Sequence, residues 1–284
     1  MFAEFKHTLR RMSGRIWGWG IGLALYSLML VYFYEVFMKS WGLMEQYLAQ
    51  YPQELLAFFG ELTTSITPKG YLDTYYYLYM TLILGIFAVA EGANLLAEDE
   101  EKGILDLVMA HPVSRVALFW GRWLAFAAAA AAILLLGWVA WLPFAQRVGL
   151  DLSWLQFLLP NLPLLAELLL FGSLALLFSM VLPASRSASG LAGALLAANW
   201  LLRGLAAMNK DLQSVMKWTP LHFYQGGLAV DGLKWSWLAG LLGAALLLAL
   251  VAMVLFQRRD IRVGGERSWT LPVWGRRQTF LRSQ

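Results

Sequence analysis

Six apolar stretches, each long enough to cross a lipid bilayer, most restrict how this chain can fold. A crossing helix takes about 20 apolar residues, and its backbone groups must bond within the segment. The composition agrees, since 60% of the 284 residues are hydrophobic and only 14% are charged. The sequence predicts an all-α integral membrane protein. Its expected spans are about 16–37, 73–97, 116–144, 155–182, 187–208 and 235–257.

The third and fourth stretches are longer than a perpendicular helix needs. We therefore expect tilted helices, or interfacial turns near Pro143, Pro160 and Pro163. The first stretch is too long for the apolar region of a signal peptide, and no small-x-small cleavage site follows it. It is interpreted as a retained first span.

The distribution of basic residues predicts the orientation. Six crossings put both termini on one side, and 15 of the 22 lysines and arginines lie in segments on that side. Because short cytoplasmic segments carry the excess of basic residues, both termini are expected in the cytoplasm. The sequence thus predicts a multi-pass protein of a bacterial inner membrane, surrounded by the lipid bilayer.

Two segments lie outside the expected 16–257 transmembrane domain. Residues 1–15 carry Phe2, Phe5, Leu9 and Met12 at helical spacing, which predicts an amphipathic elbow helix on the inner membrane surface. A frayed tail with accidental spacing is the alternative. Residues 258–284 form a basic cytoplasmic tail suited to anionic headgroups or to a cytosolic partner.

Two longer segments are expected on the outer side, at about 38–72 and 209–234. The first has helical periodicity over 46–59, followed by a polar run and a turn signal at Pro68-Lys69-Gly70. Small helices covering a cavity would give this pattern, and so would a packing insert without a role.

The inner segment 98–115, with the sequence EDEEKGILDLVMAHPVSR, is the most informative part of the chain. Its acids at 98–101 are expected to begin a helix, since the macrodipole favours negative charge there. The apolar residues that follow, and a stop at Pro112, predict a short amphipathic helix. Such a helix either lies on the membrane or docks into a groove of a soluble protein, and the acids favour the protein.

This segment resembles the first cytoplasmic loop of the ABC-2 type permeases of ATP-binding-cassette transporters, which reads approximately E-E-x-G-T-L-E-L-L-L-A-x-P-V-S-R. The matching residues are Glu100, Glu101, Gly103, Leu105, Leu107, Ala110, Pro112, Val113, Ser114 and Arg115. The departures are Ile104 for Thr, Asp106 for Glu and Val108-Met109 for Leu-Leu. The ending F-Q-R-R-D at 256–260 resembles the family's F-x-R-R-D, so the resemblance covers nearly the whole chain.

The resemblance implies the transmembrane subunit of an exporter, whose loop is a coupling helix seated in a cleft of an ATPase subunit. The implied contact residues are Glu100, Glu101, Gly103, Leu105, Asp106, Pro112, Val113, Ser114 and Arg115, with Ser185 and Arg186 as a minor second contact. It also implies two copies of the ATPase and a second permease, either this chain or a paralogue. Small-residue rows at Gly18/Gly22 and Ser189/Gly193/Ala197 allow close helix approach, within one chain or between two.

The chain contains no phosphate-binding G-x-x-x-x-G-K-[ST] motif. ATP and Mg are therefore expected on the partner subunit, with no cofactor and no catalytic residue in this chain. The chain has no cysteine and only three histidines, which argues against a thiolate or multi-histidine metal site. We expect a non-enzymatic subunit with no metal and no nucleic-acid partner.

Ionisable and amide groups inside expected spans suggest function, because burying them in a membrane is costly. These residues are Glu91, Asn94, Glu167, Asn199 and Arg203. They could line a translocation path or serve structure, and a Glu167–Arg203 pair is the preferred structural interpretation. The alternative function is a proton-coupled secondary transporter or channel that uses Glu91 and Glu167. That alternative leaves the 98–115 motif unexplained, and the sequence does not predict the substrate.

Overall fold

The computed structural model describes residues 1–48, 50–52, 56, 67–105 and 113–258. Every regular element in this part of the chain is helical. Six helical segments are long and apolar enough to cross a membrane, which confirms the all-α, six-span prediction. They are Ser13–Lys39 (α2), Pro68–Glu101 (α5, η2 and α6), Arg115–Trp141 (α8), Trp154–Val181 (α9 and α10), Ser185–Met208 (α11) and Trp235–Arg258 (α13).

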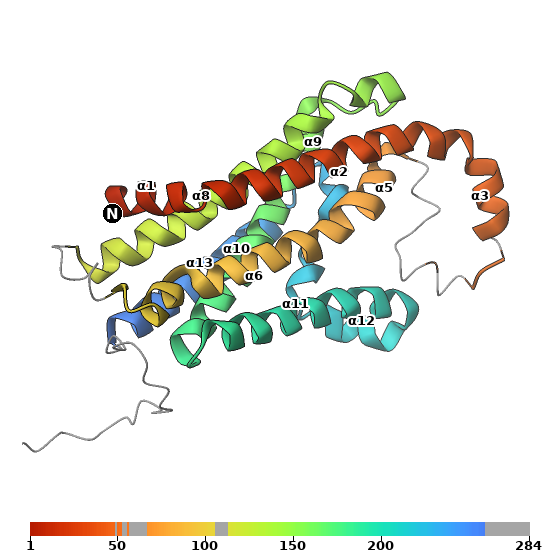
Figure 1. Cartoon of the computed structure of the whole chain (residues 1–284). Coiled ribbons are helices and arrows are strands. Elements are labelled where there is room, and N and C mark those ends of the chain that lie inside the picture. Colours follow the sequence, from red (N-terminus) through yellow and green to blue (C-terminus); the bar gives the residue numbers. More distant parts are fainter. Residues whose placement is uncertain (49, 53–55, 57–66, 106–112, 259–284) are drawn as a thin grey trace, which may run out of the picture.

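The second and fourth crossings form the centre of the bundle. In an apolar stretch of 18 residues within each of them, 72% of the residues are buried, against 22% in the corresponding stretch of the fifth crossing. Helix α10 (Asn161–Val181) packs against α6 (Leu78–Glu101), α13 and α11, while α2 packs along α8 (Figure 1). The apolar surfaces of the outer helices are left exposed, as expected for helices that lipid surrounds.

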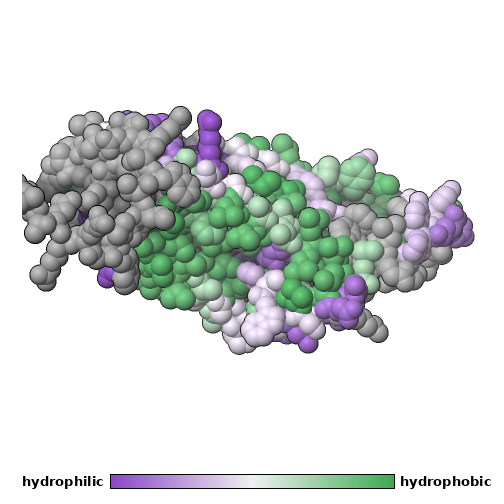
Figure 2. Space-filling model, turned by 90° about the horizontal axis from the view of Figure 1, so that it is seen from below, coloured by the Kyte–Doolittle hydropathy of each residue, from purple (hydrophilic) through white to green (hydrophobic). Residues whose placement is uncertain are grey.

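Apolar side chains cover much of the face seen from below (Figure 2). On α11 the exposed residues include Leu191, Leu195, Leu201 and Leu205. A patch of this size on a water-soluble protein would mark an interaction site. In a six-span protein it matches a surface that contacts lipid or another membrane helix.

The second crossing is longer than predicted, and the prediction of a turn at Pro68-Lys69-Gly70 is wrong. These residues form the first turn of α5 (Pro68–Leu72), which continues through the π-helical η2 (Asp73–Tyr77) into α6. Thr67 caps α5, since its Oγ1 accepts a hydrogen bond from the Gly70 N–H at 3.1 Å. Proline is favourable in a first helical turn because its missing N–H would have no partner there.

The interfacial turns expected beside prolines are present. Helix α8 ends at Trp141, two residues before Pro143. Pro160 separates α9 (Trp154–Leu158) from α10. The third crossing therefore ends near Pro143, and the fourth is interrupted at Pro160, with Pro163 in the first turn of α10.

The segment 209–234 folds back onto the beginning of the second crossing. It contains α12 (Lys210–Met216) and two 3-10 turns, Pro220–His222 and Gly226–Asp231. The Gly227 N–H donates to Oδ1 of Asp73 at 2.6 Å, and Lys69 pairs with Asp231. In the other expected outer segment, α3 (Trp41–Leu48) is described, and half of the residues of the 46–59 periodicity lie outside the described residues.

The N-terminal helix α1 (Phe2–Arg11) packs along the beginning of α8. A Cβ atom built on Gly121 of α8 would lie 2.9 Å from the Met1 carbonyl oxygen and 2.9 Å from Cβ of Glu4. Only glycine therefore fits this contact without a shift. We call the end of the bundle that carries α1, the last turn of α6 and the first turn of α8 the elbow end.

We expect Gly121→Leu to displace α1 from α8, because the added side chain would overlap the α1 backbone. Trypsin cleavage within α1 should become faster, since cleavage requires local opening of the helix. The matched control is Gly14→Leu, whose Cβ would have nothing within 4 Å. Equal cleavage rates in the two variants would contradict the tight α1–α8 contact.

Candidate functional site

The acids at 98–101 end α6, so the prediction that they begin a helix is wrong. Gly103 has a φ of +67°, which favours glycine. The Ile104 N–H bonds to the Asp99 carbonyl at 2.8 Å, and the Gly103 N–H bonds to that of Glu100 at 3.0 Å. This pair of bonds is a Schellman motif, which satisfies carbonyls at the end of a helix. The motif places the beginning of the 98–115 segment in a fixed geometry.

Asp99 joins three helices at the elbow end. Its Oδ1 accepts from Nη1 of Arg11 at 2.7 Å, and its Oδ2 pairs with Nη2 of Arg122 at 2.6 Å. The Asp99 and Arg122 side chains are 5% and 3% exposed. Arg122 also donates from Nη1 to the Leu95 carbonyl at 3.0 Å. The carboxylate thus ties α1 and α8 to the last turns of α6.

A second ion pair lies deeper in the bundle. Nη1 of Arg15 in α2 donates to Oε1 of Glu91 in α6 at 2.7 Å. Glu91 is 7% exposed, so its charge is compensated where water is scarce. With Asp99, this pair links the N-terminal part of the chain to α6 at two levels.

Glu101 brings together the two segments that the family resemblance assigns to ATPase contact. Its Oε1 accepts a hydrogen bond from the backbone N–H of Ser185 at 2.7 Å. Ser185 is the first residue of α11, where backbone N–H groups lack helical partners and a carboxylate is favourable. Arg186, the next residue, is exposed.

The other end of the 98–115 segment is also anchored. Ser114 caps α8, because its Oγ accepts from the Ala117 N–H at 3.2 Å. Arg115 donates from Nη1 to the backbone carbonyls of Phe256 at 3.1 Å and Gln257 at 3.4 Å. Arg115 therefore holds the last carbonyls of α13, which a cation stabilises.

Between these anchors the expected contact residues differ in exposure. Glu100 is 8% exposed and Leu105 is 1% exposed, whereas Ile104 is 42% exposed. Val113 is half-buried. Asp106 and Pro112 lie outside the described residues, together with the rest of 106–112.

Of the polar residues expected inside the fourth and fifth spans, Glu167 and Asn199 are buried and Arg203 is half-buried, but the preferred Glu167–Arg203 pair does not form. Glu167 is 1% exposed, and both of its carboxylate oxygens lack a hydrogen-bond partner among the described residues. Within the same part of the chain, Nη1 of Arg203 and both amide atoms of Asn199 also lack partners. The Arg203 guanidinium instead lies over the ring of Tyr224, 5.7 Å from its centre.

Tyr224 places these groups close together. Burial, and then the negative charge of Glu167, raise the pKa of Tyr224 well above its usual value. Its hydroxyl donates to the Tyr77 carbonyl at 3.2 Å. Asn94, in contrast, is half-buried near the Glu91 level of α6.

Besides Glu91, four residues form the ion pairs that join α1, α2 and α8 to α6, and we call them the junction residues: Arg11, Arg15, Asp99 and Arg122. Sequence reasoning missed them as functional candidates. One signal was available: Arg122 lies inside an expected span, and a buried arginine needs an acidic partner. The partner, Asp99, was visible only as one of four neighbouring acids.

A family model described as ABC-2 family transporter protein matches residues 4–261. None of the curated proteins compared with the chain matches it. The family match includes all six spans, α1 from its third residue onward, and Arg11, Arg15, Asp99 and Arg122. The chain therefore belongs to the ABC-2 family of transporter proteins.

Proposed function

We propose that this chain is the permease subunit of an ATP-binding-cassette exporter. In this proposal ATP and Mg bind a separate ATPase, present in two copies, and a second permease completes the transporter. Both termini and the elbow end lie on the cytoplasmic side of a bacterial inner membrane. Family membership supports the transporter function, and the excess of basic residues at the elbow end supports the orientation.

The observation that carries the proposal is the anchoring of the 98–115 segment at the elbow end. Its beginning is bonded to α1, α8 and α11 through Asp99 and Glu101, and its end is bonded to α13 through Arg115. Force applied to this segment would therefore reach four helices besides α6. A segment that only connected two spans would not need these contacts.

The contact with the ATPase is proposed to include the exposed Ile104 and the neighbouring Arg186. Asp106 and Pro112 complete it, as the family resemblance implies. Glu100, Glu101, Gly103, Leu105, Val113, Ser114, Arg115 and Ser185 either touch the ATPase or hold the segment in position. No covalent step is assigned to this chain, because the coupling in this proposal is mechanical.

One observation favours the alternative of a proton-coupled transporter. Both carboxylate oxygens of Glu167 are without a hydrogen-bond partner in the described structure. The carboxylate is therefore free to take up a proton, or to line a translocation path together with Asn199 and Arg203. Glu91 offers less support, since it is paired with Arg15. The two functions differ in whether an ATPase contacts the elbow end.

Cross-linking from single cysteines tests this difference, because the chain has no cysteine of its own. We expect Ile104→Cys, carrying a thiol-linked photo-cross-linker, to attach to an ATPase subunit in mild detergent extracts of the native host. The matched control is Leu155→Cys, because Leu155 is 46% exposed against 42% for Ile104. Leu155 lies in α9, which follows the far end of α8 from the elbow end. This control should give no such product. Identification by mass spectrometry should find the G-x-x-x-x-G-K-[ST] motif in the attached subunit.

A proton-coupled transporter predicts no ATPase product from either position. Absence of the product from Ile104→Cys, in extracts where the variant is folded and abundant, would therefore overturn the proposal. A product from both positions would show that the reagent is unspecific and would equally contradict an ATPase contact at the elbow end.

A further inference from the structure

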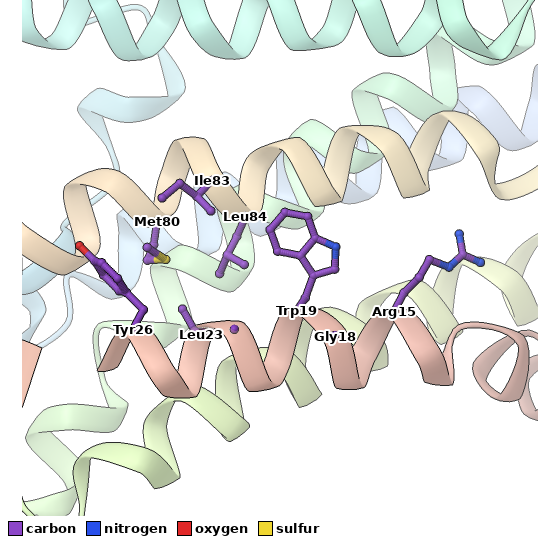
Figure 3. A pocket seen from close by; sticks show the side chains of 9 residues that line it. Arg15, Gly18, Trp19, Leu23, Tyr26, Met80, Ile83 and Leu84 are labelled. Atoms are coloured by element: carbon purple, nitrogen blue, oxygen red, sulfur yellow. The ribbon is translucent and has the colours of Figure 1, made fainter. Parts of the chain in front are cut away.

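A groove of about 500 Å³ lies between α2 and α6. Figure 3 shows the residues that line it. On α2 the lining extends from Arg15 to Tyr26, and on α6 it consists of Met80, Ile83 and Leu84. Among the described residues, Arg15 is the one charged residue of this lining, and it lies at the end of the row, towards the elbow end. The groove is therefore apolar along its length and has an arginine, paired with Glu91, at one end.

The shape of the groove fits an extended hydrocarbon chain. Arg15 and Tyr26 are eleven residues apart on one helix, which corresponds to about 16 Å at 1.5 Å per residue. Gly18 and Gly22 keep the α2 side open, since a Cβ atom on either would have nothing within 4 Å. These two glycines therefore do not serve helix packing within the described chain, and they leave room for a ligand.

The charges at the end of the groove favour a phosphate group. Nη1 of Arg15 is bonded to Glu91, and the Arg15 side chain is 36% exposed, so other N–H groups of its guanidinium remain accessible. The Arg15–Glu91 pair is itself balanced, whereas the neighbouring ion pairs of Asp99 with Arg11 and Arg122 hold two positive charges against one negative charge. The arginine fork is well suited to phosphate oxygens.

A second copy of the chain is the competing occupant, because glycines four residues apart often allow two membrane helices to meet. A two-fold axis along the membrane normal would bring equal depths of the two chains together. Arg15 would then face the partner's Arg15, with Arg11 of each chain close by. Like charges at this position disfavour such a contact, whereas a lipid phosphate is attracted.

We propose that this groove binds a phospholipid, with an acyl chain along Gly18, Gly22 and Leu84 and with its phosphate on Arg15. The site lies at the lipid-facing surface between α2 and α6, so a bilayer lipid reaches it without crossing the protein core. The proposal is independent of the transport function, since it requires neither an ATPase nor a cargo.

The first test uses photo-labelling in the membrane. The full-length protein is placed in phosphatidylcholine vesicles containing a small fraction of phosphatidylglycerol with a photo-reactive acyl chain. We expect saturable labelling of residues in 18–26 and 80–84, which unlabelled phosphatidylglycerol competes away. Gly22→Leu fills the groove and should lose this labelling, whereas Gly14→Leu, equally open but outside the groove, should keep it.

The second test examines the phosphate. Arg15→Gln should lose the preference for phosphatidylglycerol over phosphatidylcholine in competition while the groove is still labelled. Glu91→Gln breaks the same ion pair but keeps the arginine, so it should retain the preference. Unequal behaviour of these two variants separates headgroup binding from a general loosening of the bundle.

Three results would overturn the proposal. The first is equal labelling of wild type and a folded Gly22→Leu variant. The second is labelling spread evenly over exposed positions of α11 and α13, which indicates only surrounding lipid. The third is efficient cross-linking of two Gly18→Cys chains to each other, which would show that a second copy covers the groove.

Discussion

Replacing Asp99 with alanine should destabilise the protein by about 3–5 kcal/mol, because removing one partner of a buried ion pair leaves an uncompensated charge. Both carboxylate oxygens of Asp99 are used, and the Arg122 side chain is only 3% exposed. Without the carboxylate, Arg122 retains the Leu95 carbonyl but no acidic partner in the described structure. The free energy of unfolding of the purified protein in detergent measures the loss.

The matched control for this prediction lies one residue away. Glu98 pairs with Lys102 at 2.6 Å, but the side chains are 33% and 57% exposed. An exposed pair of this kind contributes roughly 0.2–1 kcal/mol, so Glu98→Ala should have a small effect. Similar losses for the two variants would contradict the assignment of Asp99 as the centre of the junction.

A double variant separates the ion pair from general damage. Asp99→Ala combined with Arg122→Leu removes the buried charge as well as its partner. It should recover part of the stability lost by Asp99→Ala, since apolar replacement of a whole buried pair is often neutral. In the proposed exporter, the single Asp99→Ala variant should also lose ATP-dependent transport under conditions where it is still folded, because α1 and α8 are no longer tied to α6.

The spans could be predicted from sequence because lipid imposes one strong requirement on a segment, namely length without charge. The elements between them depend on pairings that a local pattern does not contain. Arg11 and Asp99, for example, are 88 residues apart. The sequence showed excess positive charge at the elbow end but not which arginine meets which acid.

The acids at 98–101 show how one physical argument can be outweighed by others. The macrodipole disfavours acids at a helix C-terminus, typically by 0.3–1 kcal/mol. Against this stand the paired arginines on Asp99, the Ser185 N–H on Glu101 and the glycine geometry at Gly103. Gly103 was the signal for a helix end, since glycine commonly follows the last helical turn.

The failed Glu167–Arg203 pair has a geometric cause. Helices α10 and α11 do pack against each other. Both side chains come close to Tyr224, but the guanidinium lies over its ring rather than within hydrogen-bond distance of the carboxylate, and sequence spacing alone does not fix this placement. Arg203 is held over Tyr224, from a segment that sequence patterns placed only as an outer loop.

Gly92→Ala should be the most damaging small substitution in the bundle. A Cβ atom on Gly92 would lie 2.1 Å from the carbonyl oxygen of Gly172, so α6 and α10 would have to separate. These helices form the two most buried crossings, and separation would open contacts along both. We expect a loss of about 3 kcal/mol or more, at or above the usual cost of overpacking, because backbone rather than a side chain must move.

Two further glycines make this a graded test. A Cβ on Gly85 would lie 2.5 Å from Cδ2 of Leu196, a side-chain atom that can rotate away, so Gly85→Ala should cost clearly less. A Cβ on Gly193 would have nothing within 4 Å, and Gly193→Ala should be neutral or stabilising because alanine favours helix more than glycine. The measurement is the unfolding temperature of each of the three variants, monitored by size-exclusion chromatography after heating. If Gly92→Ala unfolds no earlier than Gly85→Ala, the backbone contact between α6 and α10 is not what sets their separation.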